Sequence, residues 1–404
     1  MYKKLLLVVA ILATAVMVNA QTIVVSGGTT ATSGSPYFTI KDAVDAINVG
    51  GALTGNVTVD VPAGHTETLT APIVLTATGT STESLVFQKS GAGANPLITA
   101  FVGTNLASAA TIDVMWQVNG SDYVTIDGID FVDTNSTGAP MMEVAVGFFK
   151  VSATDGCNNN TVKNCVITLN RNNTVAGSGI RTQVAGSVGI ALLACTPTAG
   201  NTAILQTSLA GASSNNSFQN NTIQNVNMGI AMVGGAVASP YSLADLNNVI
   251  GGSSTTGNNI INFGGGTSPS FACAAALIRD QWSFTISHNV IDNNVGGTGG
   301  FNHTTSQRGI WLFAASAGAS ANINNNTLTI RGAGTGINWI IDVEMAQTGA
   351  NGNTININNN QFLNCTQVVT TAAAFVPIWL NTTASNINVT GNTIDNFSTP
   401  TTGL

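Results

Sequence analysis

The sequence predicts an all-β solenoid of stacked coils whose N-terminal end is capped by a short helix. Two observations lead to this fold class: a composition that disfavours helices, and a strand-and-turn motif that recurs about every 34 residues. Charged residues are only 7% of the chain, while glycine occupies 44 positions. Because Glu, Lys and Arg normally cover helix surfaces, and Gly, Asn, Ser and Thr favour strands and turns, this is not the composition of a helical protein. An apolar content of 44% is sufficient for a buried core.

Residues 1–20 have the features of a secretory signal peptide. Two lysines precede a mostly apolar run from Leu5 to Val18, and Ala20 supplies the small residue for cleavage before Gln21. This run is too short to span a bilayer, and no later segment has the length of a membrane helix. We therefore expect a secreted or cell-surface protein without a membrane span.

Charge and cysteine content restrict the partners further. Eleven basic side chains, two of them in the signal peptide, stand against eighteen acidic ones. Nucleic acid and anionic membranes both require a basic face, so neither is an expected partner. The five cysteines are an odd number, and Cys165 and Cys195 fall in strand-like runs. Small buried residues are therefore expected there in preference to disulfides.

The N-terminal region, residues 21–110, is predicted to contain the cap and the first coils. The stretch SPYFTIKDAVDAIN indicates a short amphipathic helix near residues 39–49, with Thr39 as its N-cap. The apolar residues of this helix share one face: Ile40, Ala43, Val44 and Ile47. Such a helix would cover the apolar end of a solenoid, which otherwise exposes unpaired strand edges.

The remainder, residues 111–404, is predicted to form regular coils of about 34 residues. A turn motif of Asn, any residue and an apolar residue recurs there, beginning at Asn221, Asn259, Asn289, Asn326, Asn360 and Asn392. A second motif, an apolar run led by glycine, begins at Gly189, Gly229, Gly309 and Gly336. Neither motif has the helical period, and short runs of Ile, Val, Leu and Phe between Gly and Asn indicate strands.

The repeated asparagines have a structural interpretation. A sharp turn between two strands of one coil needs a left-handed residue, which Asn and Gly tolerate best. Coils stacked about 4.8 Å apart would place equivalent asparagines above one another, so that their amides hydrogen-bond in a ladder. We interpret all six asparagines as scaffold, with no role in binding or catalysis.

With these motifs the chain resembles the right-handed parallel β-helix, or pectin-lyase-like, family of secreted bacterial proteins, over nearly the whole mature chain. The stretch NVTVDVPAGHTETLTAPIVL after the helix is similar to the first coil of family members. Members are often polysaccharide lyases, hydrolases or pectin esterases, so the resemblance implies an enzyme hypothesis. However, the signature motifs of polygalacturonases, pectate lyases and pectin methylesterases are absent. No catalytic residue is therefore transferred from the family.

The scarce charged residues give one candidate cluster for catalysis. Along GINWIIDVE, strict alternation directs Trp339 to one side and Asp342 and Glu344 to the other. Together with cations of neighbouring coils, these carboxylates form the candidate set Arg279, Asp280, Arg308, Asp342 and Glu344. Paired carboxylates can serve a glycosidase or bind calcium. The alternative is a solvated strand end with ion pairs, and no other metal or cofactor is expected.

A row of outward-facing side chains suggests a sugar-binding track. If Ile310 and Leu312 face inward, alternation points Trp311 outward, and Trp379 and Asn338 occupy comparable positions in nearby coils. Aromatic side chains on an exposed strand can stack on sugar rings. Trp311, Asn338 and Trp379 are thus the candidate ligand-binding residues. The alternative is that long loops cover and bury these tryptophans.

The sequence therefore favours a secreted or surface-displayed adhesin or carbohydrate-binding and structural module without catalysis, whose partner is a polysaccharide or cell-surface glycan. The alternative is a polysaccharide lyase or glycoside hydrolase acting on uronate-containing glycans. A structural spacer in a larger surface protein is a third hypothesis. The chain stops at NFSTPTTGL soon after a full coil, without an evident capping helix. We accordingly expect a truncated stack or one that makes end-to-end contacts.

Overall fold

The computed structural model describes residues 22–400 apart from short segments. The segments left out are 105–110, 136–140, 174, 239–240, 265–271, 295–301, 314–319, 337, 345–353, 371–373, 383 and 385. The signal peptide predicted for residues 1–20 lies outside the described residues.

Most described strands belong to three long sheets that run the length of the molecule. The eleven-stranded sheet contains β1 (Val24–Gly27), β2 (Val57–Pro62), β5 (Leu85–Ser90), β8 (Val124–Asp127), β11 (Thr161–Lys163), β14 (Ser217–Gln219), β18 (Val249–Gly251), β22 (Phe284–Ser287), β25 (Ala321–Asn324), β29 (Thr354–Asn358) and β33 (Asn386–Thr390). The ten-stranded sheet contains β3 (Thr66–Thr68), β6 (Leu97–Thr99), β9 (Asp130–Val132), β12 (Val166–Thr168), β15 (Thr222–Gln224), β19 (Asn259–Ile261), β23 (Val290–Asp292), β26 (Thr327–Thr329), β30 (Gln361–Leu363) and β34 (Thr393–Asp395). The nine-stranded sheet contains β4 (Ile73–Leu75), β7 (Val114–Asn119), β10 (Val144–Phe149), β13 (Val188–Leu193), β16 (Met228–Val233), β20 (Cys273–Arg279), β24 (Gln307–Leu312), β28 (Asn338–Val343) and β32 (Phe375–Leu380).

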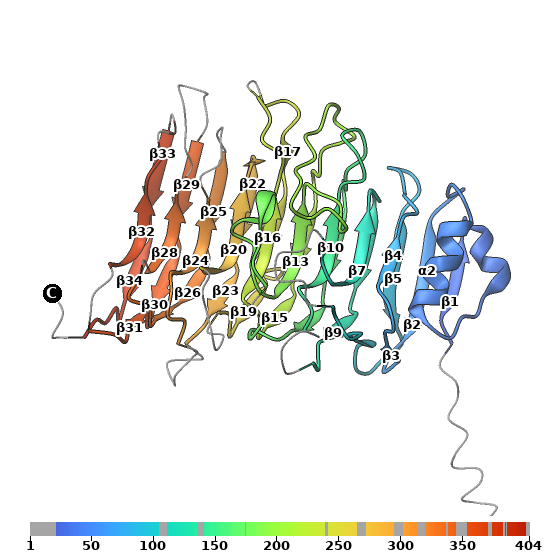
Figure 1. The fold of residues 1–404 in the computed structure, drawn as a ribbon, viewed down its shortest axis with the longest axis horizontal. Helices are drawn as coiled ribbons and strands as arrows, with labels where there is room; N and C mark the ends of the chain where they lie inside the picture. Colours follow the sequence, from blue (N-terminus) through green and yellow to red (C-terminus); the bar gives the residue numbers. More distant parts are fainter. Residues whose placement is uncertain are drawn as a thin grey trace, which may run out of the picture.

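Each strand pairs in parallel with the equivalent strand of the next coil, apart from the antiparallel pair of β1 and β2. One coil thus contributes a strand to each long sheet, as β11, β12 and β13 do, and the coils lie side by side along the long axis (Figure 1). Two short pairs, β17 (Asp245–Leu246) with β21 (Gln281–Trp282) and β27 (Arg331–Gly332) with β31 (Thr366–Gln367), add to the stack. The protein is a right-handed parallel β-helix, and the predicted fold class is confirmed.

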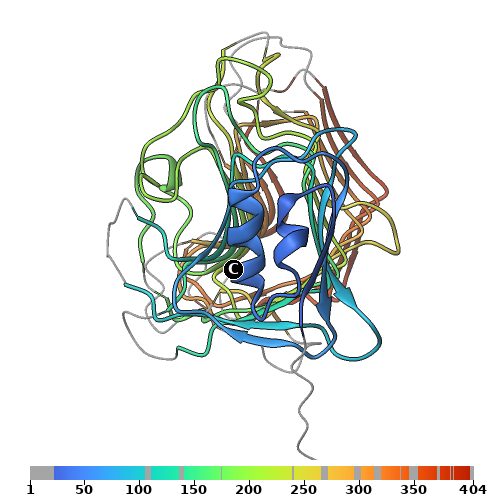
Figure 2. The same ribbon diagram turned by 90° about the vertical axis from the view of Figure 1, so that its right-hand side faces the viewer.

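A helical cap closes the N-terminal end of the stack, as predicted. The α-helix α2 (Ile40–Val49) and the short 3-10 helix η1 (Thr30–Gly34) lie in front of the first coils in Figure 2. The Thr39 side chain accepts a hydrogen bond from the backbone N–H of Asp42, as an N-cap does. The buried carboxylate of Glu67, in β3, accepts further N–H groups at the same helix end. This contact fixes the cap to the first coil.

The core follows from strand alternation. In the eleven-stranded sheet, apolar residues such as Phe218, Ile323 and Ile357 are fully buried, while their neighbours face outward. All five cysteines are buried and unpaired. Burial raises the pKa of Cys165 to about 12, so this residue stays a thiol. Among the described residues, no helix is long and apolar enough to cross a membrane.

The nine-stranded sheet departs from simple alternation. In most of its strands two consecutive residues face the core, as Met115 and Trp116, Ala145 and Val146, Ala275 and Ala276, and Ile340 and Ile341 do. The first of the two positions is glycine in several coils, and a Cβ at Gly229 would lie 2.6 Å from Ile260 of the opposite sheet. Because of this bulge, each residue that precedes it in the strand points to the opposite side from the one that strict alternation predicts. The glycine-led runs of the sequence therefore mark this close approach.

Candidate functional site

The asparagine motif forms a buried column of hydrogen bonds between coils. The backbone N–H of Asn289 donates to the side-chain oxygen of Asn326 at 3.0 Å, and the Asn289 amide donates to the same oxygen at 2.9 Å. Asn326 donates to Asn360 in the same way. This asparagine ladder contains Asn221, Asn258, Asn289, Asn326, Asn360 and Asn392. It satisfies turn groups that have no water available.

One predicted member of the ladder is wrong. Asn259 is the first residue of β19 and is exposed, whereas Asn258 is fully buried and accepts from Asn221 at 2.9 Å. In the other coils the residue before the ladder asparagine is left-handed, as Asn325 is with a φ of 57°. Here Gly257 precedes the ladder residue, and a Cβ on it would lie 1.7 Å from a carbonyl oxygen of the next coil. Asn259 pairs with Thr222 of the preceding coil, so Asn258 is the equivalent of Asn221 and the predicted motif is displaced by one residue.

A second, shorter column was missed. Asn160 donates its N–H to the side chain of Asn216 at 3.0 Å, Asn216 donates to Asn248 at 2.8 Å, and the Asn248 amide donates to Gln281 at 2.6 Å. The signal for it is an Asn pair before the strands of the eleven-stranded sheet, in NNNTV, NNSF and NNVI. The shorter column lies before the strands of the eleven-stranded sheet, whereas the ladder lies after them.

The predicted catalytic residues divide into two separate groups. Arg308 forms an ion pair with Asp342 and lies 3.9 Å from a carboxylate oxygen of Glu344. The guanidinium of Arg308 also lies 3.9 Å from the ring centre of Trp311, whose Nε1 donates to Glu344 at 3.0 Å. We call these four residues, with Trp339, the arginine cluster. It is a closed arrangement, because the Asp342 side chain is 0% exposed and that of Arg308 only 5%.

Arg279 and Asp280 make contacts elsewhere. Arg279 pairs with Asp280 at 3.3 Å, donates to the carbonyl of Ile180 at 3.1 Å and lies over the ring of Phe313. Asp280 occupies a left-handed turn position, with a φ of 52°. Among the described residues, no group of three or more His, Cys, Asp or Glu side chains could hold a metal ion.

The predicted sugar track is wrong in its geometry. Asn338 faces the interior, where its amide donates to the carbonyls of Gly334 and Gly336 at 3.2 Å each. The residue in register with Trp311 and Trp379 is Asp342. Trp311 is only 3% exposed, which agrees with the alternative interpretation that this tryptophan is buried.

The bulge explains the error at Trp339. This side chain lies on the outer side, where it stacks on Trp379 with ring centres 4.3 Å apart and an angle of 13°. Strict alternation from Asp342 would have directed it inward, but Ile340 and Ile341 both face the core. Trp379 itself is 39% exposed.

Burial raises the pKa of Asp342 to about 7, against the lowering effect of Arg308. Between about pH 4 and pH 7 the folded protein therefore holds a proton on this carboxyl that the unfolded chain has released. The free energy of unfolding should consequently fall as the pH rises through that window, by about 2 kcal/mol from pH 5 to pH 7. Glu143, whose pKa burial raises to about 7, adds an effect of the same sign.

Thermal unfolding followed by circular dichroism from pH 5 to pH 8 measures this effect. Between pH 5 and pH 8 the Tm of the Asp342→Asn variant should decrease less than that of the wild type. The Tm of Asp395→Asn, a change at an exposed position, should decrease as much as that of the wild type. An unchanged slope in Asp342→Asn would contradict the assignment.

The outer side of the eleven-stranded sheet carries an ordered line of short side chains. One residue from each of ten coils lies in register: Thr58, Val86, Thr125, Thr161, Ser217, Val249, Thr285, Asn322, Asn356 and Asn388. We call this line the polar row. At roughly 4.8 Å per coil it extends over about 43 Å. Its last amides hydrogen-bond to one another at 2.8 Å, from Asn388 to Asn356 and from Asn356 to Asn322.

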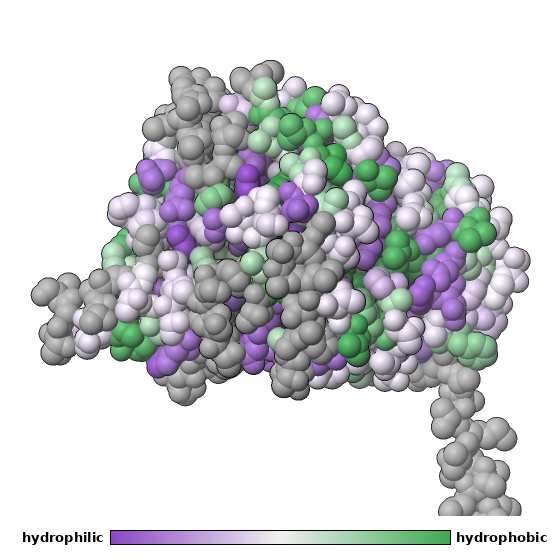
Figure 3. All heavy atoms as spheres, viewed as in Figure 1, coloured by the Kyte–Doolittle hydropathy of each residue, from purple (hydrophilic) through white to green (hydrophobic). Residues whose placement is uncertain are grey.

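A second line runs beside the polar row and includes Gln88, Asp127 and Lys163. A hollow of about 230 Å³ opens at its edge, lined by Gln88, Lys89, Asn95, Asp127, Gly128 and Asn164. The Lys163 ammonium lies 3.2 Å from Asp127. On the side of the molecule that Figures 1 and 3 both show, hydrophilic, intermediate and hydrophobic residues are mixed.

A comparison with solved structures found proteins that align with 89% of this chain at low sequence identity. The surface protein and adhesin PfbA of Streptococcus pneumoniae aligns over 89% of this chain and 93% of its own, with 13% identity and a TM-score of 0.45. The mannuronan C-5 epimerase AlgE6 A-module of Azotobacter vinelandii aligns over 89% and 94%, with 12% identity and a TM-score of 0.30. The catalytic domain of a GH87 alpha-1,3-glucanase in complex with nigerose aligns over 89% and 66%, with 14% identity and a TM-score of 0.33.

No protein-family model matches the sequence, and no curated protein does.

Proposed function

We propose that this protein is an exported carbohydrate-binding module or adhesin that holds a neutral, extended polysaccharide along the polar row. The observation that carries the proposal is the row itself. Hydroxyl and amide groups from successive coils repeat at the coil spacing, which is comparable to the rise per sugar in an extended glycan. A regular polymer could therefore make hydrogen bonds at eight of the ten coils of the row.

The chemistry of the row favours a neutral glycan. Eight of its ten residues are Thr, Ser or Asn, and none is charged. Hydroxyl and amide groups both donate and accept hydrogen bonds, as sugar hydroxyls do. Thr125, Thr161 and Thr285 are each partly exposed on this surface. A uronate polymer would need cations, and Lys163 beside the row is already paired with Asp127.

The hollow at Gln88 and Asp127 offers a deeper position for one sugar residue. Its lining combines amide groups, a carboxylate and the ammonium of Lys89, which can bind neighbouring hydroxyls from several directions. In this proposal the polymer lies on the row and places one sugar or branch in the hollow.

Pull-down with insoluble neutral and acidic polysaccharides tests the proposal. A triple variant, Thr125→Glu with Thr161→Glu and Thr285→Glu, puts bulk and negative charge on the row. Binding to the neutral polysaccharide retained by the wild type should fall at least about tenfold, since three of the ten positions along the row then carry bulk and negative charge.

The ten-stranded sheet offers a matched control. Thr222→Glu, Thr327→Glu and Thr393→Glu place the same change at outward positions of three coils. This control should bind like the wild type. Equal binding by both triple variants would contradict the proposal.

The arginine cluster does not support the lyase or hydrolase alternative. Its Asp342 is fully buried and its Glu344 is held by Trp311 and Arg308. The cluster would have to open before a polymer could reach Asp342, while the Glu344 side chain is 21% exposed. Calcium binding at this cluster stays a hypothesis, and it too would require the cluster to open around Asp342.

A further inference from the structure

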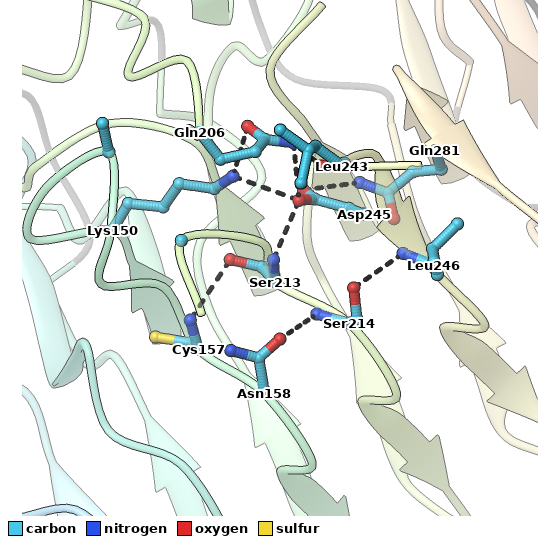
Figure 4. A network of polar contacts seen from close by, with 12 residues as sticks. Lys150, Cys157, Asn158, Gln206, Ser213, Ser214, Leu243, Asp245, Leu246 and Gln281 are labelled. Carbon is cyan, nitrogen blue, oxygen red and sulfur yellow. Dashed lines mark hydrogen bonds and ion pairs between the residues drawn. The ribbon is translucent and has the colours of Figure 1, made fainter. Parts of the chain in front are cut away.

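A fully buried lysine lies beside a carboxamide and a carboxylate at the side of the stack. Lys150 follows β10 directly and is 0% exposed, and Gln206 and Asp245 around it are 4% and 1% exposed. Figure 4 shows the Lys150 ammonium directed at both partners. It lies 2.8 Å from Oε1 of Gln206 and 3.1 Å from Oδ1 of Asp245. The three residues come from segments far apart in the sequence.

The carboxylate contacts both nitrogen atoms of this arrangement. Oδ1 of Asp245 accepts from the Lys150 ammonium at 3.1 Å and from the Gln206 amide at 3.4 Å. It also accepts from the backbone N–H of Ser213 at 2.8 Å, while Oδ2 accepts from Gln281 at 3.3 Å. The carboxylate is thereby fixed between a nucleophile and an amide nitrogen.

The Gln206 carboxamide is fixed as well. Its amide donates to the carbonyl of Leu243 at 2.7 Å. A Cβ on Gly235 would lie 2.7 Å from its Oε1, so the space beside it is already filled. Because the carbonyl bond is about 1.2 Å long, the Lys150 nitrogen is within about 4 Å of Cδ. That is close to the separation from which an amine attacks a carbonyl carbon.

We propose that Lys150 and Gln206 form an intramolecular isopeptide bond, with Asp245 as the proton-transfer group. The Lys150 ammonium transfers a proton to Asp245, and the resulting amine adds to Cδ of Gln206. The bond between Cδ and Nε2 of Gln206 then breaks, and the amide nitrogen leaves with protons from Asp245 and Lys150 as ammonium. The products are one amide bond and one ammonium ion, no oxidant or reductant is consumed, and Asp245 returns to its carboxylate form.

The bond would fasten an insertion to the stack. Gln206 belongs to the segment between β13 and β14, and Lys150 follows the strand of the preceding coil. A link between residues 56 positions apart restricts the unfolded chain as a disulfide does. Burial of the three groups excludes the water that would compete for the carbonyl.

Mass spectrometry of the purified wild-type protein tests the proposal without a variant. A proteolytic digest should contain the Lys150 and Gln206 peptides joined together, with a mass lower than their sum by one ammonia. Lys163, which pairs with Asp127 at the surface, is the internal control and should be recovered unmodified. Separate, unmodified Lys150 and Gln206 peptides would overturn the proposal, and so would a link from Lys150 to Asp245 with loss of water.

Two variants test the roles of the groups. Asp245→Asn should leave the peptides unjoined, or slow their joining at least about tenfold, if Asp245 transfers the proton. Gln206→Glu should not lose ammonia at this site. Joining in Asp245→Asn at the wild-type rate would refute the assignment of Asp245.

Discussion

Replacing Asn258 with alanine is expected to lower the free energy of unfolding by about 4 kcal/mol. The Asn258 side chain accepts from the N–H and the amide of Asn221 and donates to the carbonyl of Phe218 at 2.8 Å. Its removal leaves two buried backbone groups without partners, and each such group costs about 1–3 kcal/mol. Alanine cannot replace either bond, and water has no access to the column. The midpoint of urea denaturation measures the effect.

Asn259→Ala is the matched control one residue away. Asn259 is exposed in β19, so its replacement should change the free energy of unfolding by less than about 0.5 kcal/mol. Equal effects at the two positions, or a larger one at Asn259, would contradict the register of this coil.

Replacing Arg308 with methionine is expected to cost about 4 kcal/mol at pH 8. The change leaves the fully buried carboxylate of Asp342 without its cation, and breaking one side of a buried ion pair typically costs about 3–5 kcal/mol. The guanidinium also covers Trp311 at 3.9 Å, and methionine preserves only part of that packing. At pH 5 the cost should be smaller, because Asp342 is then protonated.

Two comparisons separate charge from packing in this cluster. Arg308→Met combined with Asp342→Leu should recover most of the lost stability, since no buried charge remains unpaired. Arg279→Met, at a side chain that is 23% exposed, should cost about 1 kcal/mol or less. If the double variant were as unstable as Arg308→Met at pH 8, the unpaired carboxylate would not be the cause.

The repeat was readable from sequence because the turn chemistry is local. Asn and Gly are placed by the left-handed turn and the inter-coil hydrogen bonds, so they recur wherever a coil turns. Thr39 and the apolar face behind it predict the cap for the same reason. The misplaced Asn259 shows the limit of such a pattern. Two adjacent asparagines can each begin the motif, and only the glycine before Asn258 decides between them.

The outer surface was less predictable because it depends on a bulge and on coverage by other segments. Alternation is reliable within the eleven-stranded sheet, where no bulge intervenes. In β28 it fails between Trp339 and Asp342, which places Asn338 inside and Trp339 outside. The Lys150 site brings together residues 56 and 95 positions apart, which local patterns do not relate.

A crystal structure of the protein with a neutral oligosaccharide tests the proposed function most directly. We expect sugar density along the eleven-stranded sheet, in contact with Thr125, Thr161 and Thr285 and with successive sugars at successive coils. Density confined to the exposed ring of Trp379, to the arginine cluster or to the ten-stranded sheet would contradict the proposal.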